Sequence, residues 1–416
     1  MRTAQQQLAA LRGELQTSTA RIRALDDDTL AWQMRLAAIP APTGAELNRA
    51  AVVARALESL GCTTRQDAAG NVIAERMRSA TTESTLPPIV CMAHLDTVFD
   101  AQTSLVLSRN GAHVSCPGIG DNGRGLATML TLARVVREMS ARRLPLRRPI
   151  AFVATVGEEG LGNLRGARAY FENRAAMRDP APHGVLVLDG PGDENIVHHA
   201  LGSRRYRVTF RGAGGHSWAD FGAPNAVHAA SRAATWLAEL PRNLRGSVAL
   251  TVSGIGGGES MNAIPAQSWI EVDVRATDQE LLTRVEIELR QIVRAACHAE
   301  VSARSGSGRA PDQFANAVSA FQSDVTVLGE RPCGLLPREH ALVQLAQAAS
   351  RLHNVEPVSA IASTDANIPL SLGIPAITIG GGGSGGGAHT VHEWYDNTNG
   401  PRGIARAFAI LAALAA

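Results

Sequence analysis

The most constraining feature of this chain is an apolar run that ends abruptly in ionisable residues. Residues 89–93 are all apolar and follow two prolines, a pattern typical of a β-strand buried on both faces. His94 closes the run and Asp96 follows two positions later, so alternation along a strand places both side chains on one face. A carboxylate or carbonyl commonly fixes the second ring nitrogen of a metal-bound imidazole. The motif indicates either a metal ligand with its orienting neighbour or a buried histidine satisfied by an aspartate.

Two further apolar runs also end in carboxylates. Residues 150–156 are followed by Gly157, Glu158 and Glu159, and residues 185–188 are followed by Asp189. Adjacent carboxylates at a strand end point in different directions, so one can bind a metal while its neighbour faces a water molecule. The alternative is a solvated acidic pair. Apolar strands separated by helical stretches predict an α/β fold with a parallel sheet, whose ligands lie at the carboxyl ends of the strands.

The glycine-rich segment 116–125, CPGIGDNGRG, contains a literal GxGxxG dinucleotide fingerprint. We reject that interpretation because Pro117, rather than an apolar strand, precedes it, and because Asp121 would face a pyrophosphate. The segment instead opens a helix predicted over 126–139. Asp121 is then either an N-cap residue or a carboxylate that bridges two cations.

A second glycine-rich segment, residues 380–387, follows a strand predicted over 374–379. It matches GxSxG, but no helix follows and a histidine comes too soon for the order of a serine hydrolase. A flexible linker is the other alternative. We expect these glycines to let backbone amides approach a substrate. His389 and Glu393 then close the set of ionisable residues.

The alternation of polar and apolar residues changes between residues 204 and 332, where it becomes typical of an antiparallel sheet with one solvated face. We predict a small α+β domain over 204–332, inserted into an α/β catalytic domain made of 1–203 and 333–416. Residues 1–28 are predicted as an additional amphipathic helix that packs on its own domain or on a partner subunit.

Three polar residues of the predicted insert are candidates for substrate contacts. His216 lies in GGHS, Asn262 in SMNAIP, and Arg275 ends the strand IEVDVR. An arginine beside an asparagine can hold a carboxylate through forked hydrogen bonds, whereas an exposed surface arginine is the alternative.

Composition excludes several classes of function. Forty basic residues, all of them arginine, stand against 38 acidic ones, a balance that does not indicate nucleic-acid binding. The absence of lysine excludes Schiff-base enzymes and Walker-type phosphate loops. Five scattered cysteines without a CxxC pair indicate a reducing compartment. With neither a signal peptide nor a membrane span in view, we expect a cytoplasmic protein that does not bind membranes.

Together, five motifs resemble those of the M20 family of dizinc peptidases and deacylases, from about residue 39 to the end. They are HLD at 94–96, GDNG at 120–123, GEE at 157–159, LDG at 188–190 and AHTVHE at 388–393. The resemblance implies a zinc-binding α/β domain interrupted by a lid domain that usually dimerises. It therefore implies a homodimer formed through the insert, and a small peptide or N-acyl amino acid as the substrate.

The resemblance also implies a role for each motif residue. The ligands of two divalent ions, most simply Zn²⁺ with Co²⁺ or Mn²⁺ as alternatives, would be His94 and Asp189 on one ion, Glu159 and His389 on the other, and Asp121 between them. The remaining roles would fall to Glu158 as general base, Asp96 as the residue that orients His94, His216 as an oxyanion donor, and Asn262 and Arg275 in substrate binding.

Three functions are consistent with this pattern. Asp189 agrees with peptidase T and related dipeptidases, whereas many deacylases have glutamate there, so the resemblance favours an exopeptidase acting on di- or tripeptides. An N-acyl amino acid deacylase is the second interpretation, with Arg275 holding the carboxylate of the substrate. A non-catalytic, metal-bound interaction protein is the third. The complete ligand set, together with Glu158, argues against this third interpretation.

Overall fold

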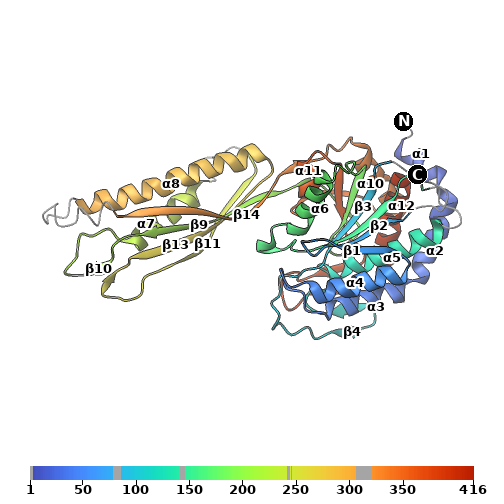
Figure 1. The fold of residues 1–416 in the computed structure, drawn as a ribbon, viewed down its shortest axis with the longest axis horizontal. Helices are drawn as coiled ribbons and strands as arrows, with labels where there is room; N and C mark the ends of the chain where they lie inside the picture. Colours follow the sequence, from blue (N-terminus) through green and yellow to red (C-terminus); the bar gives the residue numbers. More distant parts are fainter. Residues whose placement is uncertain (1–2, 78–85, 141–145, 241–243, 245, 306–319) are drawn as a thin grey trace. The chain divides into compact units, whose positions relative to one another are not determined.

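The structure is a computed structural model that describes residues 3–77, 86–140, 146–240, 244, 246–305 and 320–416. It divides into two compact units (Figure 1). Unit 1 comprises Met1–Ala200 and Gly334–Ala416, and unit 2 comprises Leu201–Cys333. Unit 2 is therefore inserted between two segments of unit 1.

Unit 1 is built on a nine-stranded mixed sheet, which confirms the predicted α/β class. The strands, in spatial order, are β1 (Thr63–Gln66), β2 (Val72–Met77), β6 (Ile150–Thr155), β3 (Ile89–His94), β7 (Gly184–Leu188), β17 (Ala376–Ile379), β8 (Asn195–Ala200) and β15 (Gly334–Leu335), with β16 (Val358–Ala362) also paired to β8. The four strands predicted from apolar runs, β6, β3, β7 and β17, are parallel neighbours at its centre.

The prediction of a parallel sheet is wrong towards both edges. There β1 pairs antiparallel with β2, β2 with β6, β8 with β17, and β15 with β8. The turn at residues 67–71 explains one of these edges, because so short a connection between β1 and β2 permits only a hairpin.

The helices of unit 1 pack around this sheet (Figure 1). Helices α5 and α12 contact β3, whereas α10 contacts β8 and β17. Their bounds are α1 (Ala4–Ala10), α2 (Arg12–Ala24), α3 (Asp26–Ala37), α4 (Leu47–Ser59), α5 (Gly123–Ser140), α6 (Arg165–Ala176), α10 (Ala341–Leu352), α11 (Asn367–Ser371) and α12 (Gly400–Ala415), with a short 3-10 helix at Gly160–Gly162. No helix among the described residues is long and apolar enough to cross a membrane.

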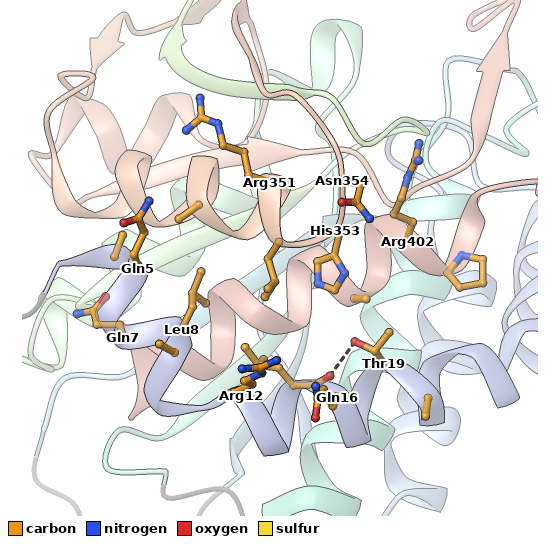
Figure 2. Close-up of a pocket in the computed structure, with 18 of the residues that line it drawn as sticks. Gln5, Gln7, Leu8, Arg12, Gln16, Thr19, Arg351, His353, Asn354 and Arg402 are labelled. Atoms are coloured by element: carbon orange, nitrogen blue, oxygen red, sulfur yellow. Dashed lines mark hydrogen bonds between the residues drawn. The ribbon is translucent and has the colours of Figure 1, made fainter.

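The N-terminal segment is not the single helix predicted over 1–28, of which residues 1–2 lie outside the described part. It is interrupted at Leu11, between α1 and α2, and at Leu25, between α2 and α3. Helix α1 packs on α10, and α2 packs on α12 and α5, so the segment belongs to its own unit, as one of the two alternatives predicted. Helices α1 and α2, together with α10 and α12, border a pocket of about 1770 Å³ (Figure 2). None of the predicted site residues lines this pocket.

Unit 2 is an antiparallel sheet with helices α7 (Ala226–Glu239) and α8 (Gln279–Ser305) packed on it (Figure 1). The strand order is β11 (Val248–Gly257), β13 (Gln267–Ala276), β9 (Gly202–Arg211) and β14 (Gln322–Arg331). Alternate residues of β13 are buried, as the predicted alternation requires. A separate short pair joins β10 (Gly215–His216) to β12 (Ala263–Ile264).

A small third sheet joins segments of unit 1 that are distant in sequence. Its order is β18 (Ser384–Gly386), β19 (Trp394–Asp396), β5 (His113–Ser115) and β4 (Ser108–Asn110). The chain after His389 is thereby paired with the chain just before the loop that carries Asp121. The sequence analysis did not predict this sheet.

Candidate metal centre

The predicted metal ligands of unit 1 gather where the carboxyl ends of the central parallel strands meet. We call this side of the sheet the ligand edge. His94 is the last residue of β3, Glu158 and Glu159 follow β6, and Asp189 follows β7. Because these three strands are parallel neighbours, their carboxyl ends meet at the same edge. Asp121 reaches this edge from the loop that precedes α5.

The ligands form two halves that share Asp121. In the buried half, His94 Nε2 lies 3.0 Å from Asp121 Oδ1 and 3.6 Å from Asp189 Oδ1. In the open half, His389 Nε2 lies 3.1 Å from Asp121 Oδ2 and 3.1 Å from Glu159 Oε1. The two oxygens of one carboxylate thus face two different imidazoles, which is the arrangement a bridging ligand requires.

Asp96 holds the turn that carries both glutamates. Its Oδ1 accepts a hydrogen bond from the backbone N–H of Glu158 at 2.9 Å, and its Oδ2 accepts one from that of Glu159 at 3.0 Å. The hydroxyl of Thr43 donates to Oδ2 at 2.8 Å. His94 Nδ1 lies 3.0 Å from the backbone carbonyl oxygen of Asp96, but 3.6 Å from its carboxylate. Asp96 therefore touches His94 mainly through its main chain, and its carboxylate positions Glu158 and Glu159.

The electrostatics show how much negative charge this edge concentrates. Burial acts to lower the pKa of His94, but hydrogen bonds to Asp121, Asp189 and Asp96 outweigh it and raise the pKa well above its ordinary value. Hydrogen bonds to Asp121 and Glu159 raise the pKa of His389 to about 10. Burial acts to raise the pKa of Asp121, yet the two imidazoles hold it below its ordinary range. In the absence of cations, protons on the imidazoles must compensate the carboxylates.

The residues present fit a pair of divalent ions. Asp121 Oδ1 is buried and lies 3.0 Å from His94 Nε2, so a cation that replaced the proton between them would have a carboxylate oxygen and a ring nitrogen as ligands. Three groups of residues each bring their ligand atoms within 4.8 Å of one another. The groups are His94, Asp121 and Asp189; His94, Glu158 and Glu159; and Asp121, Glu159 and His389. Imidazole nitrogens combined with carboxylate oxygens are the donors that Zn²⁺, Co²⁺ and Mn²⁺ accept.

Glu158 lies beside this ligand set. Its side chain is buried, and one of its carboxylate oxygens lies within 4.8 Å of a His94 ring nitrogen and of a Glu159 oxygen. The two adjacent glutamates therefore both lie at the ligand edge, where Glu159 Oε1 contacts His389 Nε2 at 3.1 Å. The division of roles between them stays a prediction.

Two of the three candidates in unit 2 lie together. His216 on β10 is opposite Ala263, and the backbone N–H of Ser217 donates to the carbonyl of Asn262 at 2.9 Å. The Nδ1 of His216 accepts hydrogen bonds from the backbone N–H groups of Trp218 and Ala219, at 3.1 and 3.3 Å. The neutral ring then carries its proton on Nε2, so the exposed nitrogen is a hydrogen-bond donor.

Arg275 is not beside Asn262, and the expected joint hold on a carboxylate is wrong within one chain. Asn262 precedes the start of β13, whereas Arg275 lies near its end, eight residues after Gln267 and therefore about 26 Å along the strand. The Nε of Arg275 donates to Asp273 Oδ2 at 2.8 Å. Because side chains alternate along a strand, Arg275 and Asp273 lie on the same face of β13. The length of β13 separates these two residues from the β10–β12 pair.

The start of the second glycine-rich segment, residues 380–382, is buried inside the unit. The N–H groups of Gly381 and Gly382 donate to the carbonyls of Gly190 and Gly192, each at 2.9 Å. Gly382 has a φ of +91°, and a Cβ there would lie 2.2 Å from the carbonyl oxygen of Gly400. The expectation that these amides approach a substrate is therefore wrong for Gly381 and Gly382, whose small size permits close packing against the start of α12.

Sequence reasoning missed one buried carboxylate near the ligand edge. Asp365 accepts a hydrogen bond from the Thr155 hydroxyl at 2.5 Å, and Thr155 is the β6 residue opposite His94. Burial raises the pKa of Asp365 to about 6, against the effect of that hydrogen bond. Its place in STDAN, between a strand and a helix, was the available signal.

Comparison with solved structures shows the same fold. The aminopeptidase PepT of Bacillus cereus superposes with a TM-score of 0.72 at 19% identity, covering 94% of this chain and 99% of that one. A tripeptidase of Staphylococcus aureus gives 0.71 at 19%, covering 94% and 98%. The Bacillus subtilis YXEP protein, a dinuclear metal-binding peptidase of the M20 family, gives 0.67 at 17%, covering 94% and 98%.

No curated protein matches the sequence of this chain. The profile of peptidase family M20/M25/M40, however, matches residues 90–416, which include every proposed metal ligand. The chain therefore belongs to the M20/M25/M40 peptidase family.

Proposed function

We propose that this protein is a dizinc exopeptidase that hydrolyses the peptide bond of di- or tripeptides. The observation that carries the proposal is the two-sided contact of Asp121, with one oxygen on His94 and the other on His389, next to the buried carboxylate of Glu158. A site built only for structure needs no further carboxylate beside its ligands.

The ligand set assigns a place to each ion. His94 and Asp189 would hold one ion, Glu159 and His389 the other, and Asp121 would bridge them. When bound, the pair of ions polarises the scissile carbonyl and lowers the pKa of a water molecule towards neutrality.

Glu158 supplies the proton transfers in this proposal. Its carboxylate takes a proton from the attacking water and then delivers it to the departing amine, as general base and general acid in turn. Asp96 keeps Glu158 in place through the hydrogen bond from the Glu158 backbone N–H. The carboxylate that carries the proton is therefore held in a fixed position beside the metal ligands.

His216 supplies the oxyanion contact in this proposal. Its Nδ1 is already occupied by two backbone N–H donors, so Nε2–H is the group that can donate to a developing oxyanion. Asn262, next to it, would contact the substrate. Arg275 and a homodimer formed through unit 2 stay predictions from the family resemblance.

The choice of an exopeptidase rests on two observations. Asp189 is the residue shared with peptidase T and related dipeptidases, and the superposed structures include an aminopeptidase and a tripeptidase. We extend those substrates to this chain as a proposal. Two imidazoles and three carboxylates suit Zn²⁺, Co²⁺ and Mn²⁺ alike, and zinc is proposed over the other two from the family resemblance.

The test is hydrolysis by protein stripped with a chelator and then reloaded with Zn²⁺, Co²⁺ or Mn²⁺. Trialanine, a tripeptide with a free amino group, and N-acetylalanine, a single amino acid whose amino group is acylated, are supplied in parallel. We expect cleavage of trialanine that disappears with the metal and returns on reloading. Preferential cleavage of N-acetylalanine would replace the proposal with a deacylase, and cleavage of neither substrate would favour a non-catalytic protein.

Two variants test the assigned roles. Glu158→Ala is expected to keep two ions but lose about 10²- to 10⁴-fold in kcat, the usual contribution of a general base. His216→Ala is expected to lose about 10²- to 10³-fold in kcat with unchanged metal content, the usual cost of an oxyanion donor. Parallel loss of metal and activity in Glu158→Ala would contradict the base assignment, and an unchanged kcat would remove His216 from the mechanism.

A further inference from the structure

Glu393 does not point at the ligand edge, although it follows His389 in the same motif. Its side chain is 2% exposed and accepts hydrogen bonds from three backbone N–H groups. Oε2 accepts from Gly118 at 2.6 Å, and Oε1 accepts from Gly120 and from Asp121, both at 2.8 Å. A single buried carboxylate therefore holds the backbone of the loop that ends in the proposed bridging residue.

The main chain around Glu393 strengthens this attachment. The carbonyl of Glu393 accepts a hydrogen bond from the N–H of Cys116 at 3.2 Å. The next residue, Trp394, is paired with Ser115 across β19 and β5. The segment that carries His389 and the segment that carries Asp121 are thus fastened together at Glu393 and directly after it.

The loop is shaped to receive this carboxylate. Gly118 has a φ of +76°, a conformation that L side chains rarely adopt. A Cβ at Gly120 would lie 3.0 Å from Glu393 Oε1, closer than ordinary packing allows. Glycines at these two positions let three N–H groups of the loop converge on one anion, which charge-assisted hydrogen bonds stabilise.

From this geometry we infer that Glu393 is a positioning residue that keeps Asp121 between the two imidazoles. The inference rests on the proposed function, because it assigns Asp121 as the shared ligand of two ions. His389 lies four residues before Glu393. The Glu393 side chain therefore also fixes how far His389 lies from Asp121, the proposed bridging residue. Without it, Asp121 would keep its contact with His389 less firmly, and the ion of the open half would bind more weakly.

The variant Glu393→Gln tests this inference. A carboxamide has one acceptor oxygen, so its NH₂ group would face at least one backbone N–H of the loop. We expect one ion to bind as in the unsubstituted protein and the other to bind about 10- to 100-fold more weakly, the usual cost of losing a residue that orients a ligand. Stepwise titration of metal-free protein with Zn²⁺, followed by calorimetry and metal analysis, measures both affinities.

Asp67→Asn is the matched control. Asp67 Oδ1 also accepts three backbone N–H groups, from Ala69, Gly70 and Asn71 at 3.0 to 3.1 Å, but in a turn that carries no proposed ligand. It is expected to lower the melting temperature while two ions still bind with unchanged affinities. A general effect of losing a loop carboxylate would appear in both variants, whereas a positioning effect appears only in Glu393→Gln.

A measurement without metal keeps the inference testable even if Glu393→Gln folds poorly. Amide hydrogen exchange in the metal-free protein is expected to be slow at Gly118, Gly120 and Asp121, and faster at these sites in Glu393→Asp, whose shorter side chain keeps the charge. Fast exchange at these amides in the unsubstituted protein would overturn the inference, as would unchanged affinity for both ions in Glu393→Gln. Failure of the unsubstituted protein to bind two ions would instead overturn the proposed function.

Discussion

The two halves of the candidate metal centre differ in how the fold supports them. His94 is 2% exposed, ends a central strand and has its second ring nitrogen against the carbonyl of Asp96. His389 is 55% exposed, lies on a loop and has a φ of +65°. A non-glycine residue in this conformation costs about 1–3 kcal/mol, which the surrounding contacts must offset.

This difference shows that one half is part of the core and the other is attached to it. The buried half is positioned by the strands themselves, so its geometry follows from folding. The open half depends on contacts between segments distant in sequence, through Asp121 and the small sheet of β5 and β19. We therefore expect the open half to exchange its ion more readily and to be the half that a substrate approaches.

Replacement of Asp121, the residue that both halves share, should abolish metal binding in both halves. Asp121→Ala removes the carboxylate that both halves use, and two adjacent cations then lose the anion that offsets their repulsion. We expect loss of both ions and of all metal-dependent hydrolysis, measured by metal analysis and trialanine cleavage. Retention of two ions would show that Asp121 is not the bridge.

Replacement of one imidazole at a time should separate the halves. His94→Ala and His389→Ala are each expected to weaken one ion by more than about 100-fold, beyond the loss caused by an orienting residue. His94→Ala should also lower the melting temperature of the metal-free protein, since it leaves buried carboxylates without their partner. Equal melting temperatures for the two variants would contradict the difference in support.

Asp96 should affect the open half, because its carboxylate holds the turn that carries Glu159. Asp96→Asn replaces an acceptor of two backbone N–H groups by an amide that can accept with only one atom. We expect about 10- to 100-fold weaker metal binding together with a reduced kcat, because Glu158 moves with the turn. A loss confined to metal binding would limit Asp96 to its contact with His94.

The pH dependence of metal binding should sharpen the comparison further. The pKa of His389 is raised to about 10, so its ring carries a proton in the metal-free protein at pH 8, and contacts with Asp121 and Asp189 also raise the pKa of His94. A metal ion must displace each such proton, and affinity is expected to rise with pH by about tenfold per unit for each proton released. Calorimetry in buffers of different ionisation enthalpy counts the protons, and an affinity independent of pH between 7 and 9 would contradict the expectation.

The raised pKa of His389 also makes the stability of the metal-free protein depend on pH. The folded value for His389, about 10, lies above its ordinary value of 6.5, so its ion pairs stabilise the fold fully below pH 6.5. That stabilisation is lost as the pH rises through about 10. Thermal unfolding of the metal-free protein should show a decline over this range that is smaller in His389→Ala.

The sequence by itself determined the central strands and the chemistry at their ends. An apolar run such as residues 89–93 can be buried only inside a sheet, and the ionisable residues that follow it then lie at the sheet edge. This local logic predicted His94, Glu159 and Asp189 as neighbours. It also predicted the alternating strands of unit 2, because alternation is a property of each strand alone.

Tertiary structure decided the contacts that join distant segments. The two-sided position of Asp121, the three amides bound by Glu393 and the separation of Arg275 from Asn262 all depend on pairings between strands far apart in the chain. Local patterns do not contain these pairings, since each depends on which strands lie side by side. For the same reason, the packing of Gly382 against Gly400 and the small sheet that links β19 to β5 became visible only in the folded chain.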